Sequence, residues 1–225
     1  MIIAIDGPSG AGKSTVAKAV AKELGFSCLD TGAMYRAVAW RALKEGVALD
    51  NSDALGALAR NHKISFGHTE GDPVPRRVFS DDMEITDSIR TAEIDRSVSK
   101  VSSVPAVRQA LVEQQRRIGS EGNFVIEGRD IGTEVFPGAE VKVFLTASAE
   151  ERAHRRVRQN ADRGVGSINY EEVLADIIRR DELDSSRETA PLRPAEDAVP
   201  VDSSSMRIEE VIGSICGLAR ARMSL

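Results

Sequence analysis

The 225-residue chain carries 30 lysines and arginines against 35 aspartates and glutamates, which gives a net charge of −5 at pH 7. Hydrophobic residues make up 41% of it and charged residues 29%, as in a folded globular protein rather than a disordered or collagen-like chain. The negative charge argues against a nucleic-acid or membrane partner, and no apolar run is long enough to cross a bilayer. The chain also starts without the pattern of a signal peptide, so we expect a cytoplasmic protein.

The first elements in chain order are a strand, a glycine-rich loop and a helix. The apolar run Ile2–Ile5 predicts a buried strand, and glycines follow it closely. From Lys13 to Leu24 apolar residues recur on one face of a helix, and Gly25 is a typical helix stop. Strand, loop and helix therefore form the first building block of the fold.

Short apolar runs alternate with helix-length segments along the rest of the chain. The predicted later strands are residues 26–29, 124–126, 141–145 and 198–201. The main predicted helices cover residues 32–44, 105–119, a segment opening after Ser148, and 208–222. This alternation predicts an α/β fold with a five-stranded parallel sheet flanked by helices, and ligands at the carboxyl ends of its strands.

Two regions depart from this alternation. Between Ile64 and Glu84, glycine, proline and aspartate punctuate short apolar runs, which predicts a small β insertion at about residues 60–92. The segment Asp162–Asn169 is predicted to be a mobile loop between two helices.

The strongest chemical signal is the segment that joins the first strand to the first helix. It satisfies the phosphate-loop pattern G-x-x-x-x-G-K-[ST] with Gly7, Pro8, Ser9, Gly10, Ala11, Gly12, Lys13, Ser14 and Thr15. Glycines let such a loop turn its N–H groups toward a phosphate, and the following helix adds the positive end of its dipole. Lys13 is expected to reach the β- and γ-phosphates of a nucleotide, and the Ser14 hydroxyl to bind Mg²⁺.

Arginines on segments far apart in the sequence accompany this loop. Guanidinium groups that converge on one cleft would neutralise a phosphoryl group during its transfer, which favours a kinase. Arg36, Arg129 and Arg180 are expected near strand ends or glycine loops, where the ligand cleft of such a sheet opens. The alternative is surface charge, because Asp176, Arg180 and Asp184 have the i, i+4 spacing of solvated ion pairs.

What the protein does with a nucleotide is open on these residues alone. The Asn-Lys-x-Asp motif typical of GTPases is absent from the sequence. A nucleotide-gated binding module and a kinase for another small molecule stay as alternatives. The histidines His62, His68 and His154 stand in no serine or aspartate constellation, so no general base for a hydroxyl is evident. An acceptor that is itself a phosphate needs no such base, which favours phosphate-to-phosphate transfer.

A series of motifs resembles the bacterial cytidylate kinases over essentially the whole chain. These motifs are Gly7–Thr15, Asp30–Arg36, Glu127–Thr133, Phe136–Pro137, Glu151–Arg156 and Arg180–Leu192. The resemblance implies one P-loop kinase domain over residues 1–225, with a monophosphate-binding part at 31–110 that includes the insertion and a helical lid at 150–167. It also implies that a monomer transfers the γ-phosphate of ATP to CMP or dCMP, with Mg²⁺ as cofactor.

The resemblance further implies roles for individual residues at the acceptor. The residues expected to bind CMP are Thr31, Tyr35, Arg36, Ser99, Arg108, Arg129, Asp130, Arg180, Asp184 and Arg187. Within this set, Ser99, Arg108 and Asp130 would meet the cytosine, whose donor and acceptor groups a hydroxyl, a guanidinium and a carboxylate can match. Arg180 and Asp184 would meet the ribose, and Arg36 and Arg129 the acceptor phosphate.

For the donor, the resemblance implies that ATP lies in the phosphate loop. Lid arginines would close over its phosphates, and those expected to bind ATP are Arg152 and Arg156. Glu127 would hold Mg²⁺ through water, beside Ser14. The expected catalytic residues are Lys13, Arg129, Arg180 and Arg187.

Overall fold

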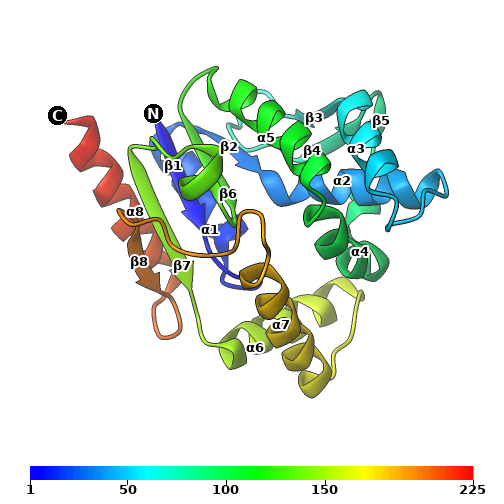
Figure 1. Cartoon of the computed structure of the whole chain (residues 1–225). Coiled ribbons are helices and arrows are strands. Elements are labelled where there is room, and N and C mark those ends of the chain that lie inside the picture. Colours follow the sequence, from blue (N-terminus) through cyan, green and yellow to red (C-terminus); the bar gives the residue numbers. More distant parts are fainter. Residues whose placement is uncertain (225) are drawn as a thin grey trace. The chain divides into compact units, whose positions relative to one another are not determined.

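The computed structural model describes residues 1–224, which divide into two compact units. Unit 1 comprises residues 1–29 together with the chain from residue 122 onward, and unit 2 comprises residues 30–121. Unit 1 holds the five-stranded sheet, whereas unit 2 is mainly helical and carries a three-stranded sheet (Figure 1). The phosphate loop therefore lies wholly in unit 1.

The sheet of unit 1 has the strand order β2-β6-β1-β7-β8. Its strands are β1 (Ile2–Asp6), β2 (Ser27–Asp30), β6 (Phe124–Gly128), β7 (Val141–Thr146) and β8 (Val199–Asp202). The central strand β1 pairs in parallel with β6 and β7, and β7 pairs in parallel with β8. This confirms the predicted α/β fold with a five-stranded parallel sheet, and it puts the loop after β1 at the edge where ligands of such sheets bind.

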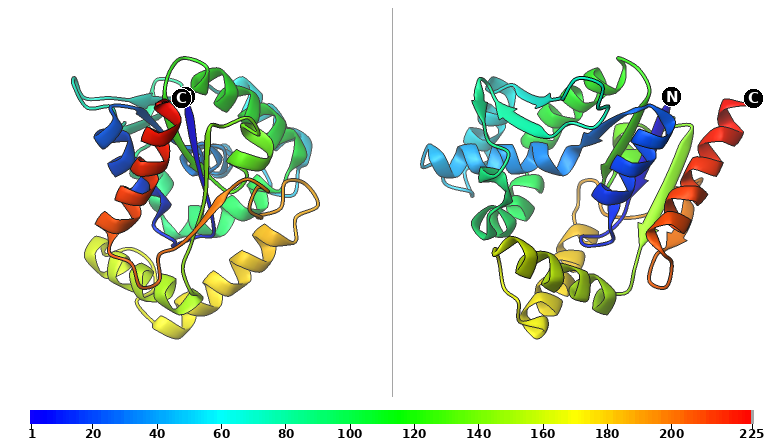
Figure 2. Two further views of the ribbon diagram at one scale, coloured as in Figure 1. Left: turned by 90° about the vertical axis from the view of Figure 1, so that its left-hand side faces the viewer. Right: turned by 180° about the vertical axis from the view of Figure 1, so that it is seen from behind.

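Two helices cover one face of this sheet. Helix α1 (Lys13–Leu24) packs against β6, helix α8 (Ile208–Met223) packs against β7, and the two helices contact each other (Figure 2). The apolar run of β1 is buried, as expected for a central parallel strand covered by helices. Gly12 and Gly25, both with positive φ, lie at the two ends of α1, so the predicted bounds of this helix are confirmed.

Helices α6 (Ala149–Arg163) and α7 (Tyr170–Ser185) pack on each other through a small apolar cluster around Ala153 and Ile177. The predicted loop Asp162–Asn169 is wrong at its first two residues, which belong to α6. The reason is that Gly164, with φ of +62°, lies at the C-terminal cap of the helix, two residues later than predicted.

Unit 2 combines four helices with the small antiparallel sheet. The helices are α2 (Thr31–Lys44), α3 (Ser52–Asn61), α4 (Ala92–Ser102) and α5 (Pro105–Gly119). The strands are β3 (Ile64–Gly67), β4 (Arg77–Ser80) and β5 (Met83–Glu84), and a short 3₁₀ helix follows at Ser88–Arg90. The predicted β insertion is confirmed as an antiparallel sheet, while α3 and α4 were not predicted.

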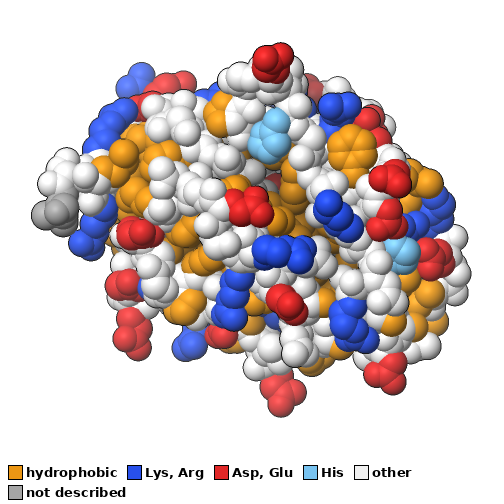
Figure 3. Space-filling model, turned by 90° about the horizontal axis from the view of Figure 1, so that it is seen from above, with side chains coloured by type: hydrophobic (Ala, Val, Ile, Leu, Met, Phe, Trp, Pro, Cys, Tyr) orange, Lys and Arg blue, Asp and Glu red, His pale blue; other side chains and the backbone are white. Residues whose placement is uncertain are grey.

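On the face shown in Figure 3, lysines and arginines are interspersed with aspartates and glutamates. Within residues 1–224, no helix combines the length and the apolar character needed to span a membrane.

Candidate active site

The phosphate loop joins β1 to α1 and owes its course to glycine. A Cβ placed on Gly7, which has φ of +148°, would lie 1.9 Å from the Leu145 carbonyl oxygen at the end of β7. Gly10 and Gly12 also have positive φ, of +82° and +92°. Side chains at these positions would clash or strain the backbone, so the motif of the sequence corresponds to a loop that only glycine can build.

Lys13 begins α1 and is buried within the loop. Its ammonium Nζ donates a hydrogen bond to the Pro8 carbonyl oxygen at 2.7 Å. Burial lowers the pKa of Lys13 well below its usual range, and Arg129 lowers it further, while Glu127 and Asp6 oppose the shift. A bound phosphate would favour the charged ammonium, because an opposite charge close by stabilises it.

Ser14 and Glu127 provide oxygen atoms next to the loop. The Ser14 hydroxyl donates a hydrogen bond to a carboxylate oxygen of Glu127, a buried residue of β6. Magnesium prefers oxygen ligands and keeps several waters, commonly with one or two protein groups and substrate phosphates. Among residues 1–224 no group of three or more histidine, cysteine or acidic side chains could hold a metal ion. The hydroxyl and carboxylate therefore fit an ion completed by phosphate and water.

Asp6, the last residue of β1, holds the chain that follows β6. Its two carboxylate oxygens accept hydrogen bonds from the N–H groups of Ile131 (2.8 Å) and Gly132 (2.7 Å), where a short π-helix, Ile131–Val135, begins. Burial raises the pKa of Asp6 to about 6, although these two N–H groups act in the opposite direction. Asp6 thus fixes the backbone directly after Arg129 and Asp130. Sequence reasoning missed this role, and the only signal was its place at the end of the strand.

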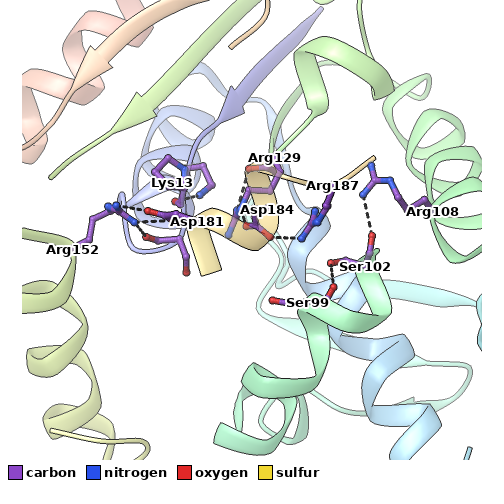
Figure 4. A network of polar contacts seen from close by, with 12 residues as sticks. Lys13, Ser99, Ser102, Arg108, Arg129, Arg152, Asp181, Asp184 and Arg187 are labelled. Carbon is purple, nitrogen blue, oxygen red and sulfur yellow. Dashed lines mark hydrogen bonds and ion pairs between the residues drawn. The ribbon is translucent and has the colours of Figure 1, made fainter. Parts of the chain in front are cut away.

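Asp184 of α7 joins two of the predicted arginines (Figure 4). Its Oδ2 accepts from Arg129 Nε at 2.9 Å, and its Oδ1 accepts from Arg187. The Asp184 side chain is 1% exposed. Burial alone would raise the pKa of Asp184, but Arg129, Arg187 and Arg180 hold it below its ordinary value. The alternative of a solvated surface ion pair is therefore wrong for Asp184. The expected place of Arg180 is also wrong, because Arg180 lies within α7 and not at a strand end or glycine loop.

The arginines of α6 contact the phosphate loop. Arg152 Nη1 donates to the Ser9 carbonyl at 3.0 Å, and Arg156 Nη2 lies 3.4 Å from the Ser9 hydroxyl. Arg155 donates to the Ser203 carbonyl at 2.7 Å and pairs with Glu151 one turn earlier on the helix. Both predicted ATP-binding arginines therefore lie beside Ser9 in unit 1.

Unit 2 brings together several of the residues predicted to bind the acceptor. The guanidinium of Arg108 on α5 lies 5.7 Å from the centre of the Tyr35 ring on α2 and donates to the Ser102 carbonyl at 3.4 Å. The Ser102 hydroxyl in turn donates to the Ser99 carbonyl at 3.1 Å. Helices α2, α4 and α5 thus gather Tyr35, Arg108 and the turn that carries Ser99.

The start of α2 carries two further predicted residues. Thr31 is the first residue of this helix and is buried. Arg36 donates to the Asp95 carboxylate and to the Ile89 carbonyl, at 3.2 Å for the latter. Asp30 caps the helix by accepting from the Ala33 N–H at 2.9 Å.

Comparisons with known proteins identify the family. The family model for cytidylate kinase matches residues 3–221. The cytidylate kinase of Streptococcus pneumoniae is 48% identical over 98% of this chain and 98% of that protein. The bifunctional pantoate ligase/cytidylate kinase of Trichormus variabilis is also 48% identical, over 99% of this chain, but the chain spans only 42% of that relative's length. A solved structure of an uncharacterized protein from Eubacterium ventriosum shares the fold alone, with a TM-score of 0.50 and 12% identity over 96% of each chain. The chain belongs to the cytidylate kinase family.

Proposed function

We propose that this protein transfers the γ-phosphate of ATP to CMP or dCMP. The observation that carries the proposal is the buried Asp184 carboxylate with Arg129 and Arg187 on its two oxygens, in the same unit as the phosphate loop. Two guanidinium groups around one carboxylate leave net positive charge for an anionic acceptor, and family membership supports CMP as that acceptor.

On the donor side, the N–H groups of the phosphate loop would surround the β-phosphate of ATP, and Lys13 would leave the Pro8 carbonyl for the β- and γ-phosphates. Ser14 and Glu127 would hold Mg²⁺, Glu127 through water, and the ion would neutralise charge on these phosphates. Lys13, Arg129, Arg180 and Arg187 are the proposed catalytic residues, because their positive charges would stabilise the transferring phosphoryl group.

On the acceptor side, we keep the roles expected from the family. Ser99, Arg108 and Asp130 would recognise the cytosine, while Arg180 and Asp184 would bind the ribose. Arg36 and Arg129 would bind the acceptor phosphate, and the set is completed by Thr31, Tyr35 and Arg187. The contact between Arg108 and the Tyr35 ring supports this assignment, because it holds a base-reading guanidinium in one place.

The segment 150–167 is the proposed lid, and Arg152 and Arg156 are its proposed residues at the ATP site. Closure of a lid excludes water, which would otherwise take the phosphoryl group in place of CMP. We further propose that the protein acts as a monomer in the cytoplasm.

An acceptor panel tests this function. The protein is incubated with Mg·ATP and, in turn, CMP, dCMP, UMP, AMP or a small non-nucleotide alcohol, with formation of ADP recorded by a coupled assay. We expect the highest kcat/KM with CMP or dCMP and slow ADP formation without acceptor. A preference for AMP or the alcohol would indicate a different kinase. ATP binding without turnover of any acceptor would indicate a nucleotide-gated binding module.

Replacement of Asp130 tests how the base is read. Asp130→Ala removes a proposed partner of the cytosine amino group, so the ratio of kcat/KM for CMP to that for UMP should fall by about tenfold. An unchanged ratio would remove Asp130 from base recognition.

A further inference from the structure

Arg152 occupies an unusual place for a residue expected to touch ATP. Its side chain is 6% exposed at the start of α6. Its Nε donates to the Ala147 carbonyl at 2.9 Å, and Nη1 donates to the Ser9 carbonyl at 3.0 Å. The Asp181 carboxylate on α7 accepts from Nη1 at 3.1 Å and from Nη2 at 2.6 Å (Figure 4).

These bonds use four of the five N–H donors of the guanidinium group. A bidentate grip on a phosphate needs two donors side by side. Arg152 would therefore have to give up the Ser9 carbonyl or part of the Asp181 carboxylate before it could bind ATP in this way, and it is buried among these partners.

The contacts of Arg152 join two parts of unit 1. One part is the phosphate loop, where Ser9 is hydrogen-bonded to Arg152 and a Cβ on Gly10 would lie 3.1 Å from the Cβ of Arg152. The other part is α7, in which Asp181 lies three residues before Asp184. Arg152 therefore connects the proposed donor loop to the helix that carries the Asp184 network.

The bond to Ser9 has a direct consequence for the loop. In a planar trans peptide, the C=O and N–H groups point in opposite directions. When Arg152 holds the Ser9 carbonyl, the N–H of Gly10 is consequently turned away from Arg152. A phosphate loop works only when its N–H groups keep such fixed directions.

We propose that Arg152 is a positioning residue rather than an ATP ligand: anchored by Asp181, it holds the Ser9–Gly10 peptide in the orientation that binds phosphate. The inference rests on the proposed function in taking ATP as the ligand of the loop, and it changes how Arg152 serves that site.

The substitution Asp181→Asn distinguishes a positioning role of Arg152 from a phosphate-binding role, because the two predict opposite changes in the Kd of Mg·ATP. It leaves Arg152 intact but removes the charge that anchors it. If Arg152 positions the loop, the Kd of Mg·ATP, measured by calorimetry without CMP, should rise by about tenfold. If Arg152 were a phosphate ligand, release of its guanidinium would leave the Kd unchanged or lower it, which would overturn the proposal.

The matched control is Asp176→Asn on the same helix. Asp176 pairs with Arg179 at 2.7 Å, and both side chains are well exposed, so loss of this pair should leave the Kd of Mg·ATP within about twofold of its original value. Thermal unfolding without nucleotide is recorded for every variant. A lower Tm for Asp181→Asn with an unchanged Kd would show a purely structural role and would contradict the proposal.

A double-mutant cycle provides a second test. Arg152→Met alone should weaken ATP binding about as much as Asp181→Asn, and the double variant should be no weaker than either single variant, because one linkage is lost in all three. Additive losses would mean that Arg152 contacts ATP independently of Asp181, and would overturn the proposal.

A further variant keeps the test possible if the first one misfolds. Where Asp181→Asn does not fold, Asp181→Glu keeps the negative charge but shifts the carboxylate by one methylene group. A raised Kd would support the proposal, and an unchanged one would overturn it. A wild-type protein that binds Mg·ATP but phosphorylates no CMP contradicts the proposed function alone, because the ATP measurements still decide the role of Arg152.

Discussion

The Asp184 network of unit 1 and the ion pair Arg76–Asp72, in the loop between β3 and β4 of unit 2, both join aspartate to arginine but in different surroundings. Asp184 is 1% exposed and bonded to Arg129 and Arg187. In the insertion, Arg76 pairs with Asp72 at 3.0 Å; the Asp72 side chain is 14% exposed, but that of Arg76 is 66% exposed. Water reaches the Arg76 guanidinium and screens its interaction with Asp72. The buried charges around Asp184 lack this solvation, so each depends on its partners. Burial, and not the count of ion pairs, therefore decides which charges control stability.

Asp184→Ala tests the energetic weight of the buried network. The substitution leaves two guanidinium groups in a largely buried site without their common carboxylate. Loss of one partner from a buried ion pair costs about 3–5 kcal/mol. We expect the free energy of unfolding, from urea titration followed by circular dichroism, to fall by about this amount. A loss below about 1 kcal/mol would place Asp184 with the solvated pairs.

Lys13→Ala tests whether buried charge in unit 1 serves catalysis rather than stability. Removal of one positioned group that stabilises transition-state charge lowers kcat by about a hundredfold to a thousandfold. The free energy of unfolding should fall less than in Asp184→Ala. Burial of the Lys13 ammonium is itself unfavourable, as its lowered pKa indicates. The assay is CMP phosphorylation by the variant, with Mg·ATP saturation checked. Full activity would contradict the role given to Lys13.

The buried carboxyl group of Asp6 makes the stability of unit 1 depend on pH. Burial raises the pKa of Asp6 to about 6 from its ordinary value of 3.8, so the folded chain binds this proton more tightly than the unfolded chain. The stabilisation from Asp6 is therefore complete below about pH 4 and is lost as the pH rises toward about 6. The difference in unfolding free energy between wild type and Asp6→Asn should decrease by about 2 kcal/mol between about pH 4 and pH 7.

Urea titrations at four pH values across this range, with both proteins in the same buffers, measure that difference. Titrating groups that do not interact with Asp6 cancel in it, because they are common to both proteins. A difference that does not change with pH would show that Asp6 has an ordinary pKa in the folded state.

The smallest change in unfolding free energy is expected for a substitution in the insertion. Arg76→Ala removes the exposed partner of Asp72, and exposed pairs contribute about 0.2–1 kcal/mol at most. We expect a change in unfolding free energy of about 0.5 kcal/mol or less, measured as for Asp184→Ala. A loss of several kcal/mol would show that exposure does not separate the two regions.

Much of the fold could be predicted because local signals set it. Gly12 and Gly25 fix the ends of α1, and alternating runs of apolar residues locate all five strands of the large sheet. Helices α3 and α4 begin at the side-chain caps Asn51 and Thr91, signals that were present but lie in polar segments next to the insertion. The π-helix at Ile131–Val135 could not be predicted, because its first N–H groups are held by Asp6, more than 120 residues away.

The residues of the candidate site also fall into two groups: those that local sequence signals identify and those that only the tertiary fold brings together. The phosphate loop is a continuous motif, so Lys13 and Ser14 could be identified from spacing alone. The pairing of Asp184 with Arg129 could not, because Arg129 lies 55 residues away in the sequence, whereas the other partner of Asp184, Arg187, is a local neighbour three residues on. Sequence spacing reports neighbours within one helix, but a carboxylate buried between elements takes its partners from the tertiary fold.

The close approach of Gly7 to the Leu145 carbonyl has one more consequence. Because a side chain at Gly7 would collide with the end of a neighbouring strand, the sheet limits the course of this loop, and we expect the loop to keep much of its shape without a nucleotide. Binding would then freeze few additional backbone torsions, so little conformational entropy would be lost when a nucleotide arrives. The parallel sheet would thus contribute to nucleotide affinity at a position that no nucleotide atom needs to touch.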